Sequence, residues 1–140
     1  MVRPFSRNLR TEISRMPKIF LCDTGLMQML WLKRLQREVL GPVFETSIYA
    51  ELLKRYAADQ IGYWRTTDKK EIDFILSLPA GPLPVEAKLS FPHATPAAIR
   101  SFLESGGEMM GNATDYRVVA LYGRPAGACM IYPWQLYTSP

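Results

Sequence analysis

The sequence has few of the features that mark secreted, metal-stapled or membrane proteins. Its two cysteines, Cys22 and Cys129, are too few for a disulfide framework and lack the paired spacing of a zinc site. We therefore expect free thiols in a reducing cytoplasm. No uncharged apolar run approaches the roughly 18 residues of a membrane span, and the opening stretch, MVRPFSRNLR, lacks the apolar core of a secretory signal. These absences predict a cytoplasmic location and no membrane partner.

The composition is that of a globular core with an uneven charge distribution. Hydrophobic residues make up 48% of the 140 residues and charged residues 21%, which fits one compact domain. Residues 1–70 contain 13 Lys and Arg against 7 Asp and Glu, whereas residues 71–140 contain 4 against 6. We expect a basic arm or linker at 1–17, followed by a single domain at 18–140. The arm fits either a nucleic-acid footprint or a solvated terminal segment.

Apolar periodicity and turn residues divide the domain into helices and strands. Pro42 suits the first turn of a helix, and Gly81-Pro82 suits a turn between two strands. The pattern predicts an α/β fold in which helices pack on a mixed sheet. We expect helices at 26–40, 41–59 and 94–105, and strands at 61–67, 71–78, 83–90, 115–123 and 128–137.

The predicted hairpin at 71–90 has an unusual set of polar residues. Asp73 lies on its first strand, and Glu86 and Lys88 lie two positions apart on the second. The simpler interpretation is that each strand shows a polar face to water. However, acidic residues are poor strand formers, and like charges on neighbouring strands repel. Two acids beside one lysine also suit a metal-dependent phosphodiester site, in which carboxylates hold a hard divalent cation.

Several motifs of the chain resemble a known superfamily. EID (71–73), VEAK (85–88) and GPVFE (41–45) resemble the motifs of the PD-(D/E)XK nucleases. A closer resemblance is to the C-terminal domain, known as domain of unknown function 4143, of prokaryotic AAA-type ATPases. It is carried by PKIFLCDTGL (17–26), GPVFETSIYAEL (41–52), YWRTTDKKEIDFIL (63–76) and PVEAKLS (84–90). The resemblance implies a restriction-endonuclease-like fold.

The resemblance also implies roles for individual residues. Asp73 and Glu86 match the metal ligands of the superfamily, for Mg²⁺ or Mn²⁺, and Lys88 matches its catalytic lysine. Glu45 matches the helical acid that completes the site, although an acid in a first helical turn is also favoured by the helix dipole. Three basic residues before the hairpin suit phosphate contacts or a solvated loop. They are Arg65, Lys69 and Lys70.

Two functions follow as expectations. The first is a divalent-metal-dependent DNA phosphodiester hydrolase, which makes DNA the expected partner. The alternative is a non-catalytic module that binds DNA or a protein partner and is normally attached to an AAA-type ATPase, whose ATPase half is absent here. The stretch GGEMMGNAT (106–114) has Asn112 where a phosphate loop requires lysine, so we expect no nucleotide cofactor.

Overall fold

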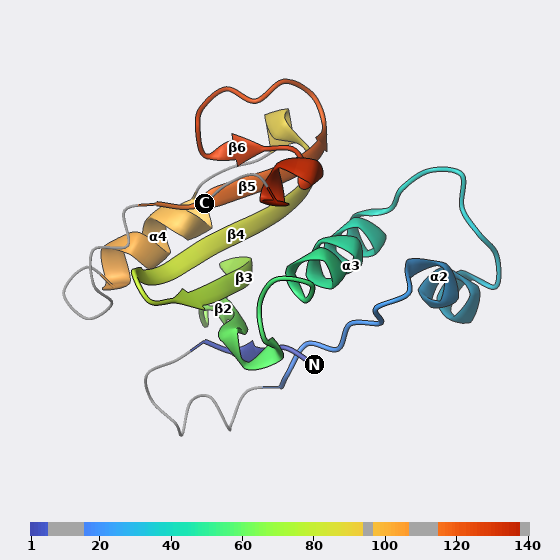
Figure 1. The fold of residues 1–140 in the computed structure, drawn as a ribbon, viewed down its shortest axis with the longest axis horizontal. Coiled ribbons are helices and arrows are strands. Elements are labelled where there is room, and N and C mark those ends of the chain that lie inside the picture. Colours follow the sequence, from blue (N-terminus) through green and yellow to red (C-terminus); the bar gives the residue numbers. More distant parts are fainter. Residues whose placement is uncertain (6–15, 94–96, 107–114, 138–140) are drawn as a thin grey trace.

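A computed structural model describes residues 1–5, 16–93, 97–106 and 115–137 of the chain. Its centre is a six-stranded sheet whose strands follow one another in chain order (Figure 1). The strands are β1 (Arg3–Pro4), β2 (Ile61–Arg65), β3 (Glu71–Leu78), β4 (Gly81–Ser90), β5 (Arg117–Tyr122) and β6 (Met130–Ile131). The helices are α2 (Thr24–Leu32), α3 (Gly41–Leu52) and α4 (Ala97–Gly106), with short 3₁₀ turns at Ala58–Gln60, Phe91–His93 and Pro133–Tyr137.

The strand pairing confirms the predicted mixed sheet and α/β class. The β2–β3 and β3–β4 pairs are antiparallel. The β1–β2, β4–β5 and β5–β6 pairs are parallel. The expected hairpin is present, but its turn lies at 79–80, because Gly81 already pairs with Leu78. Gly81 has a φ of 124°, a conformation that other residues adopt only with strain. Among the described residues, no helix is long and apolar enough to cross a membrane.

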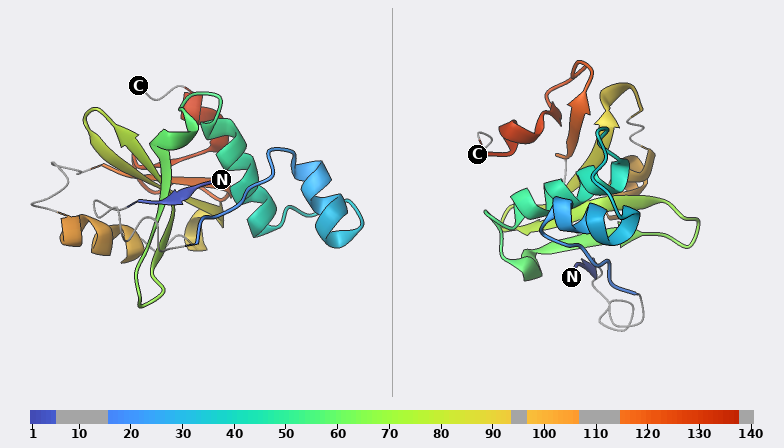
Figure 2. Two further views of the ribbon diagram at one scale, coloured as in Figure 1. Left: turned by 90° about the horizontal axis from the view of Figure 1, so that it is seen from below. Right: turned by 90° about the vertical axis from the view of Figure 1, so that its right-hand side faces the viewer.

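Two separate apolar cores cover the two faces of the sheet. One packs Phe44 and Ile48 of α3 against Phe74 of β3, and the other packs Ile99 and Phe102 of α4 against the sheet. Along β5, Val119 and Leu121 contribute to the first core, whereas Val118 and Ala120 contribute to the second. Since successive strand residues point to opposite faces, α3 and α4 lie on opposite sides of the sheet (Figure 2).

Strand β3 contains a bulge at Asp73. Gly62 of β2 pairs with Ile75 and Trp64 pairs with Ile72, so one residue of β2 faces two residues of β3. The extra residue breaks the simple alternation expected from the sequence. Ile72 and Ile75 both belong to the α4-side core, whereas Phe74 belongs to the α3-side core. Ile72 and Phe74 lie two positions apart on one strand, yet they lie on opposite faces of the sheet.

Several predicted boundaries also need correction. Helix α2 begins at Thr24, two residues before the expected start, and its N-cap Asp23 accepts the Leu26 N–H at 2.8 Å. It ends at Leu32, not at residue 40. Its C-cap residue, Lys33, has the left-handed φ of 58°. No residue of α2 is buried, so packing against the rest of the domain does not stabilise a longer helix. Helix α3 has Pro42 in its first turn, as predicted, but it ends at Leu52 and not at residue 59.

The ends of the sheet differ most from the prediction. The expected strand at 128–137 is a two-residue strand followed by a 3₁₀ turn that begins at Pro133, a residue with no N–H for a strand ladder. In the segment expected to be an arm, Arg3 and Pro4 add a parallel edge strand, and Val2 is fully buried in the α3-side core. The basic residues at 6–15 lie outside the described residues, as do 94–96 of the predicted helix and 107–114 of the GGEMMGNAT stretch.

Candidate functional site

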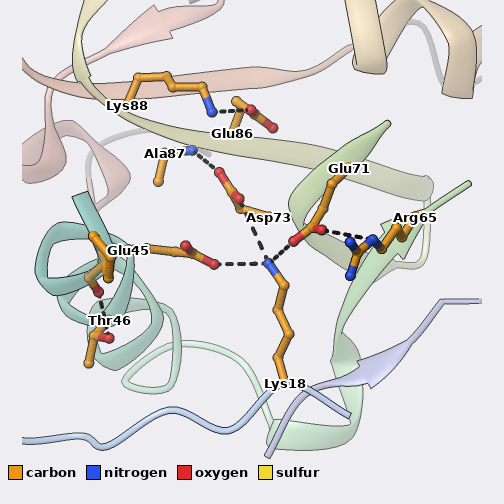
Figure 3. A network of polar contacts seen from close by, with 10 residues as sticks. Lys18, Glu45, Thr46, Arg65, Glu71, Asp73, Glu86, Ala87 and Lys88 are labelled. Carbon is orange, nitrogen blue, oxygen red and sulfur yellow. Dashed lines mark hydrogen bonds and ion pairs between the residues drawn. The ribbon is translucent and has the colours of Figure 1, made fainter. Parts of the chain in front are cut away.

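Asp73 lies where strands β3 and β4 separate. Followed away from the hairpin turn, the pairing of these strands ends at Phe74 and Val85, so Asp73 is the first β3 residue beyond the paired region. Beyond that point the Asp73 carboxylate takes the place of a backbone carbonyl and accepts the Ala87 N–H at 2.9 Å (Figure 3). Its side chain is only 13% exposed. The bulge and the separation of the strands thus hold a buried acid in a gap of the sheet.

A cluster of acidic side chains from α3 and β3 surrounds one lysine. The Lys18 ammonium lies 3.0 Å from Glu45 Oε1, contacts Glu71 Oε1 directly, and lies 3.8 Å from Asp73 Oδ1 (Figure 3). Lys18 comes from the extended segment before α2, and its backbone pairs with that of Val2. We call Lys18, Glu45, Glu71 and Asp73 the Lys18 cluster. Sequence reasoning assigned no role to Lys18 or Glu71.

Glu86 and Lys88 form a second pair on the other side of β4. Their neighbours Val85 and Ala87 contribute to the α3-side core, so Glu86 and Lys88 point to the opposite face (Figure 3). The Lys88 ammonium lies 2.5 Å from Glu86 Oε1. Glu86 is 7% exposed, and its Oε2 atom is buried without a hydrogen-bond partner in the described part of the chain. A buried carboxylate oxygen with no partner is costly in a folded protein.

The Lys18 cluster and the Glu86–Lys88 pair influence each other electrostatically across the gap between β3 and β4. Burial, together with repulsion from Glu86 and Glu45, raises the pKa of Asp73 to about 7, although the Ala87 N–H and Lys88 oppose this rise. For Lys88, burial lowers the pKa, but its hydrogen bond to Glu86 and the surrounding acids outweigh burial and raise it. The pKa of Lys18 is raised in the same way: burial lowers it, and Glu71, Glu45 and Asp73 more than compensate.

The three basic residues expected to contact phosphate have different surroundings. Arg65 ends β2, and its Nε lies 3.3 Å from Glu71 Oε2, at the edge of the Lys18 cluster. Lys69 has a φ of 63° in the turn before β3. The Lys70 ammonium donates to Ser101 Oγ of α4 at 3.1 Å. Only Arg65 of the three therefore contacts an acid of the cluster in the structure.

The acidic side chains of the site are of the type that binds divalent cations. Carboxylate oxygens are the ligands that Mg²⁺ and Mn²⁺ take, and Glu86 Oε2 has unused capacity. However, across residues 1–5, 16–93, 97–106 and 115–137, no three acidic, histidine or cysteine side chains are arranged closely enough to hold a metal ion. The acids are thus of the type that a hard cation takes, but the described residues do not bring three of them close enough to hold one, and Lys18 and Lys88 form ion pairs with them.

The middle of the chain, including α3, the hairpin and β5, matches a family model. Residues 40–126 match the model described as "Domain of unknown function (DUF4143)". The chain belongs to the DUF4143 family. The matched region includes Glu45, Asp73, Glu86 and Lys88, but it excludes Lys18. The predicted membership of domain of unknown function 4143 is therefore confirmed, whereas the resemblance to PD-(D/E)XK nucleases stays a prediction.

Two curated mycobacterial proteins are similar to this DUF4143 chain. They are "Uncharacterized protein Mb2031c" of Mycobacterium bovis and "Uncharacterized protein Rv2008c" of Mycobacterium tuberculosis. Each is 30% identical over 103 residues, which cover 70% of this chain but only 23% of the relative. The chain thus matches about a quarter of the length of these relatives. No solved structure matches the chain.

Proposed function

We propose that this DUF4143 domain is a divalent-metal-dependent phosphodiester hydrolase that acts on DNA. One observation carries the proposal: the buried carboxylate of Glu86 and the largely buried carboxylate of Asp73 lie on neighbouring strands at the point where the strands separate. The Asp73 carboxylate fills a gap in the strand ladder by accepting the Ala87 N–H. The neighbouring residue Glu86 is buried, and its Oε2 has no hydrogen-bond partner among the residues that the structure describes. Buried acids that are incompletely compensated are a common feature of functional sites. The resemblance to PD-(D/E)XK motifs supports the same proposal.

Each side chain has a role in the proposed reaction. Asp73 and Glu86 would hold the cation, and Glu45 would complete its acidic surroundings from α3. When bound, Mg²⁺ or Mn²⁺ supplies Lewis-acid polarisation of a phosphate and makes water more acidic. Lys88, which stays protonated because its pKa is raised, is positioned to stabilise negative charge that develops on the phosphate.

DNA is the proposed substrate because of the basic residues around the hairpin. The chain has a net charge of +4, and the Arg65 side chain is 54% exposed beside the Lys18 cluster. Lys69 and Lys70 lie in the adjoining turn, where they can contact a phosphate backbone without reading its sequence. A cytoplasmic location and an attached ATPase domain remain parts of this proposal.

A second candidate is a module without catalytic activity that binds DNA or a protein partner. The Lys18 cluster favours it, because one ammonium already pairs with three acids, as in a structural ion network. The test is cleavage of duplex, single-stranded and branched DNA in Mg²⁺ or Mn²⁺, by wild type and by Lys88→Ala. Metal-dependent nicking by wild type that Lys88→Ala abolishes is expected for the hydrolase. DNA binding without cleavage under every condition would favour the binding module.

A further inference from the structure

Helix α2 holds apolar side chains that stay about half exposed. Leu26, Met29 and Leu30 are 52%, 47% and 57% exposed, and no residue of the helix is buried. The helix lies at the edge of the molecule, on the side of α3 away from the sheet (Figures 1 and 2). Exposed apolar side chains that lie together mark interaction surfaces. We propose that this face of α2 binds α2 of a second copy of the chain, so that two copies pair through antiparallel helices. This pairing involves neither Asp73 nor Glu86, so it goes beyond the proposed function.

Helix α2 receives little support from the rest of the domain. It has nine residues, whereas isolated helices shorter than about 12–15 residues are marginal in water. Its contact with α3 includes Thr46 Oγ, which donates to Met27 Sδ at 3.3 Å, and Gln28 lines a groove between the two helices. Leu26 and Leu30 lie on the other side of α2. A second helix packed there would bury them and supply the packing that a helix of this length requires.

The sequence of α2 favours a second copy as the partner, because the helix is complementary to itself. Asp23, Leu26, Leu30 and Lys33 are spaced by three, four and three residues, so they follow one stripe of the helix. All four are exposed. The charged pair, Asp23 and Lys33, and the apolar pair, Leu26 and Leu30, are both centred on Gln28.

One antiparallel alignment therefore satisfies the apolar and the charged residues together. With a two-fold axis at the level of Gln28, Leu26 of one copy faces Leu30 of the other, and Asp23 faces Lys33. The residues from Thr24 to Leu32 carry no charge, so their burial requires no desolvation of an ion. Opposite ends of the two helix dipoles also lie side by side. A single short helix offers less than the about 800 Å² per partner of a stable interface, so we expect a weak dimer.

The closing experiment measures the mass of the wild-type chain by sedimentation velocity from about 1 μM to about 1 mM, the range in which weak complexes form. The mass should rise from monomer to dimer. Leu30→Glu places an acid against Leu26 of the other copy, so it should weaken association at least about tenfold. The control, Gln28→Glu, adds the same charge to the opposite side of α2. It keeps an oxygen that can accept the Gln36 N–H, now at 2.9 Å, and should associate like wild type. A wild type that stays monomeric throughout would overturn the pairing and assign the face to a different partner. Equal association of Leu30→Glu and wild type would also overturn it.

A second measurement tests the alignment without adding charge. Leu26→Cys and Leu30→Cys are each made in a chain in which Cys22 and Cys129 are replaced by serine, and disulfide formation in oxidised glutathione is followed. Mixing the two variants should give cross-linked dimers several times faster than either variant alone. Only the mixture brings a cysteine at position 26 opposite one at position 30, within the Cα separation of about 7 Å that a disulfide requires. Equal rates in the mixture and in the separate variants would overturn the antiparallel pairing.

Discussion

Replacing Asp73 with asparagine should stabilise the metal-free protein at neutral and alkaline pH. The substitution keeps the shape of the side chain and an oxygen that can accept the Ala87 N–H, but it removes a buried charge. Burial and the charges of Glu86 and Glu45 raise the pKa of Asp73 from 3.8 to about 7. A rise of this size corresponds to at most about 4 kcal/mol of destabilisation when the carboxylate is ionised.

The effect should depend on pH in a defined direction. Because the folded-state pKa is above the unfolded value, the contribution of Asp73 to stability is fully present below about pH 4. It is lost as the pH rises through about 7. Movement of nearby charges relieves part of the repulsion, so we expect Asp73→Asn to be more stable than wild type by about 2 kcal/mol at pH 8. The difference should approach zero near pH 4.

Urea unfolding in chelator at pH 8, 6 and 4.5 measures this difference, and Asp59→Asn is the control. Asp59 is exposed in a 3₁₀ turn, so its substitution should change the free energy of unfolding by less than about 0.5 kcal/mol at each pH. Excess Mn²⁺ should shrink or invert the gap, since it stabilises only a protein that binds it. A gap that is independent of both pH and metal, or a less stable Asp73→Asn at pH 8, would refute the reasoning.

Three further predictions concern the same region. Asp73→Ala should lose most of the Mn²⁺ heat that wild type shows in calorimetry, and equal heats would contradict a metal site at Asp73. Lys88→Ala should abolish slow metal-dependent nicking of DNA while its circular dichroism spectrum stays like that of wild type; retained nicking would remove Lys88 from the reaction. Phe74→Ala should lower the free energy of unfolding by about 3–5 kcal/mol in urea denaturation, because Phe74 is fully buried and packs against Phe20 and Tyr49. A loss below about 1 kcal/mol would contradict its place in the core.

The hairpin and the sheet class could be predicted from the sequence because their signals are local. Apolar runs on either side of the turn before Gly81 define two strands, and Pro42 defines the start of α3. The ends of the chain gave weaker signals. The two residues of β1 are too few to show a strand pattern, and they join the sheet only through pairing with β2, far along the chain.

The site itself depends on relations that one strand cannot show. At the bulge, one residue of β2 lies opposite two residues of β3. This mismatch depends on how the two strands pair, so the sequence of β3 alone does not show it. Lys18 reaches Glu45 across 27 positions of sequence, from a segment with no local motif for an ion pair. Glu86 and Lys88 were correctly placed on one face of β4, but the sequence did not indicate that Asp73 turns toward α3.

The bulge explains why one acid links two groups that lie on opposite sides of the sheet. A regular β3 would continue its ladder with β4 and would need no side chain to accept the Ala87 N–H. Instead, Asp73 closes the gap with a carboxylate, next to Lys18 from outside the sheet. It lies beside Glu86, one of whose oxygens is unpaired within the described part of the chain. An apolar residue in a regular strand would be the more stable choice. A local departure from stability of this kind is expected at a functional site, and here it occurs where the two strands separate.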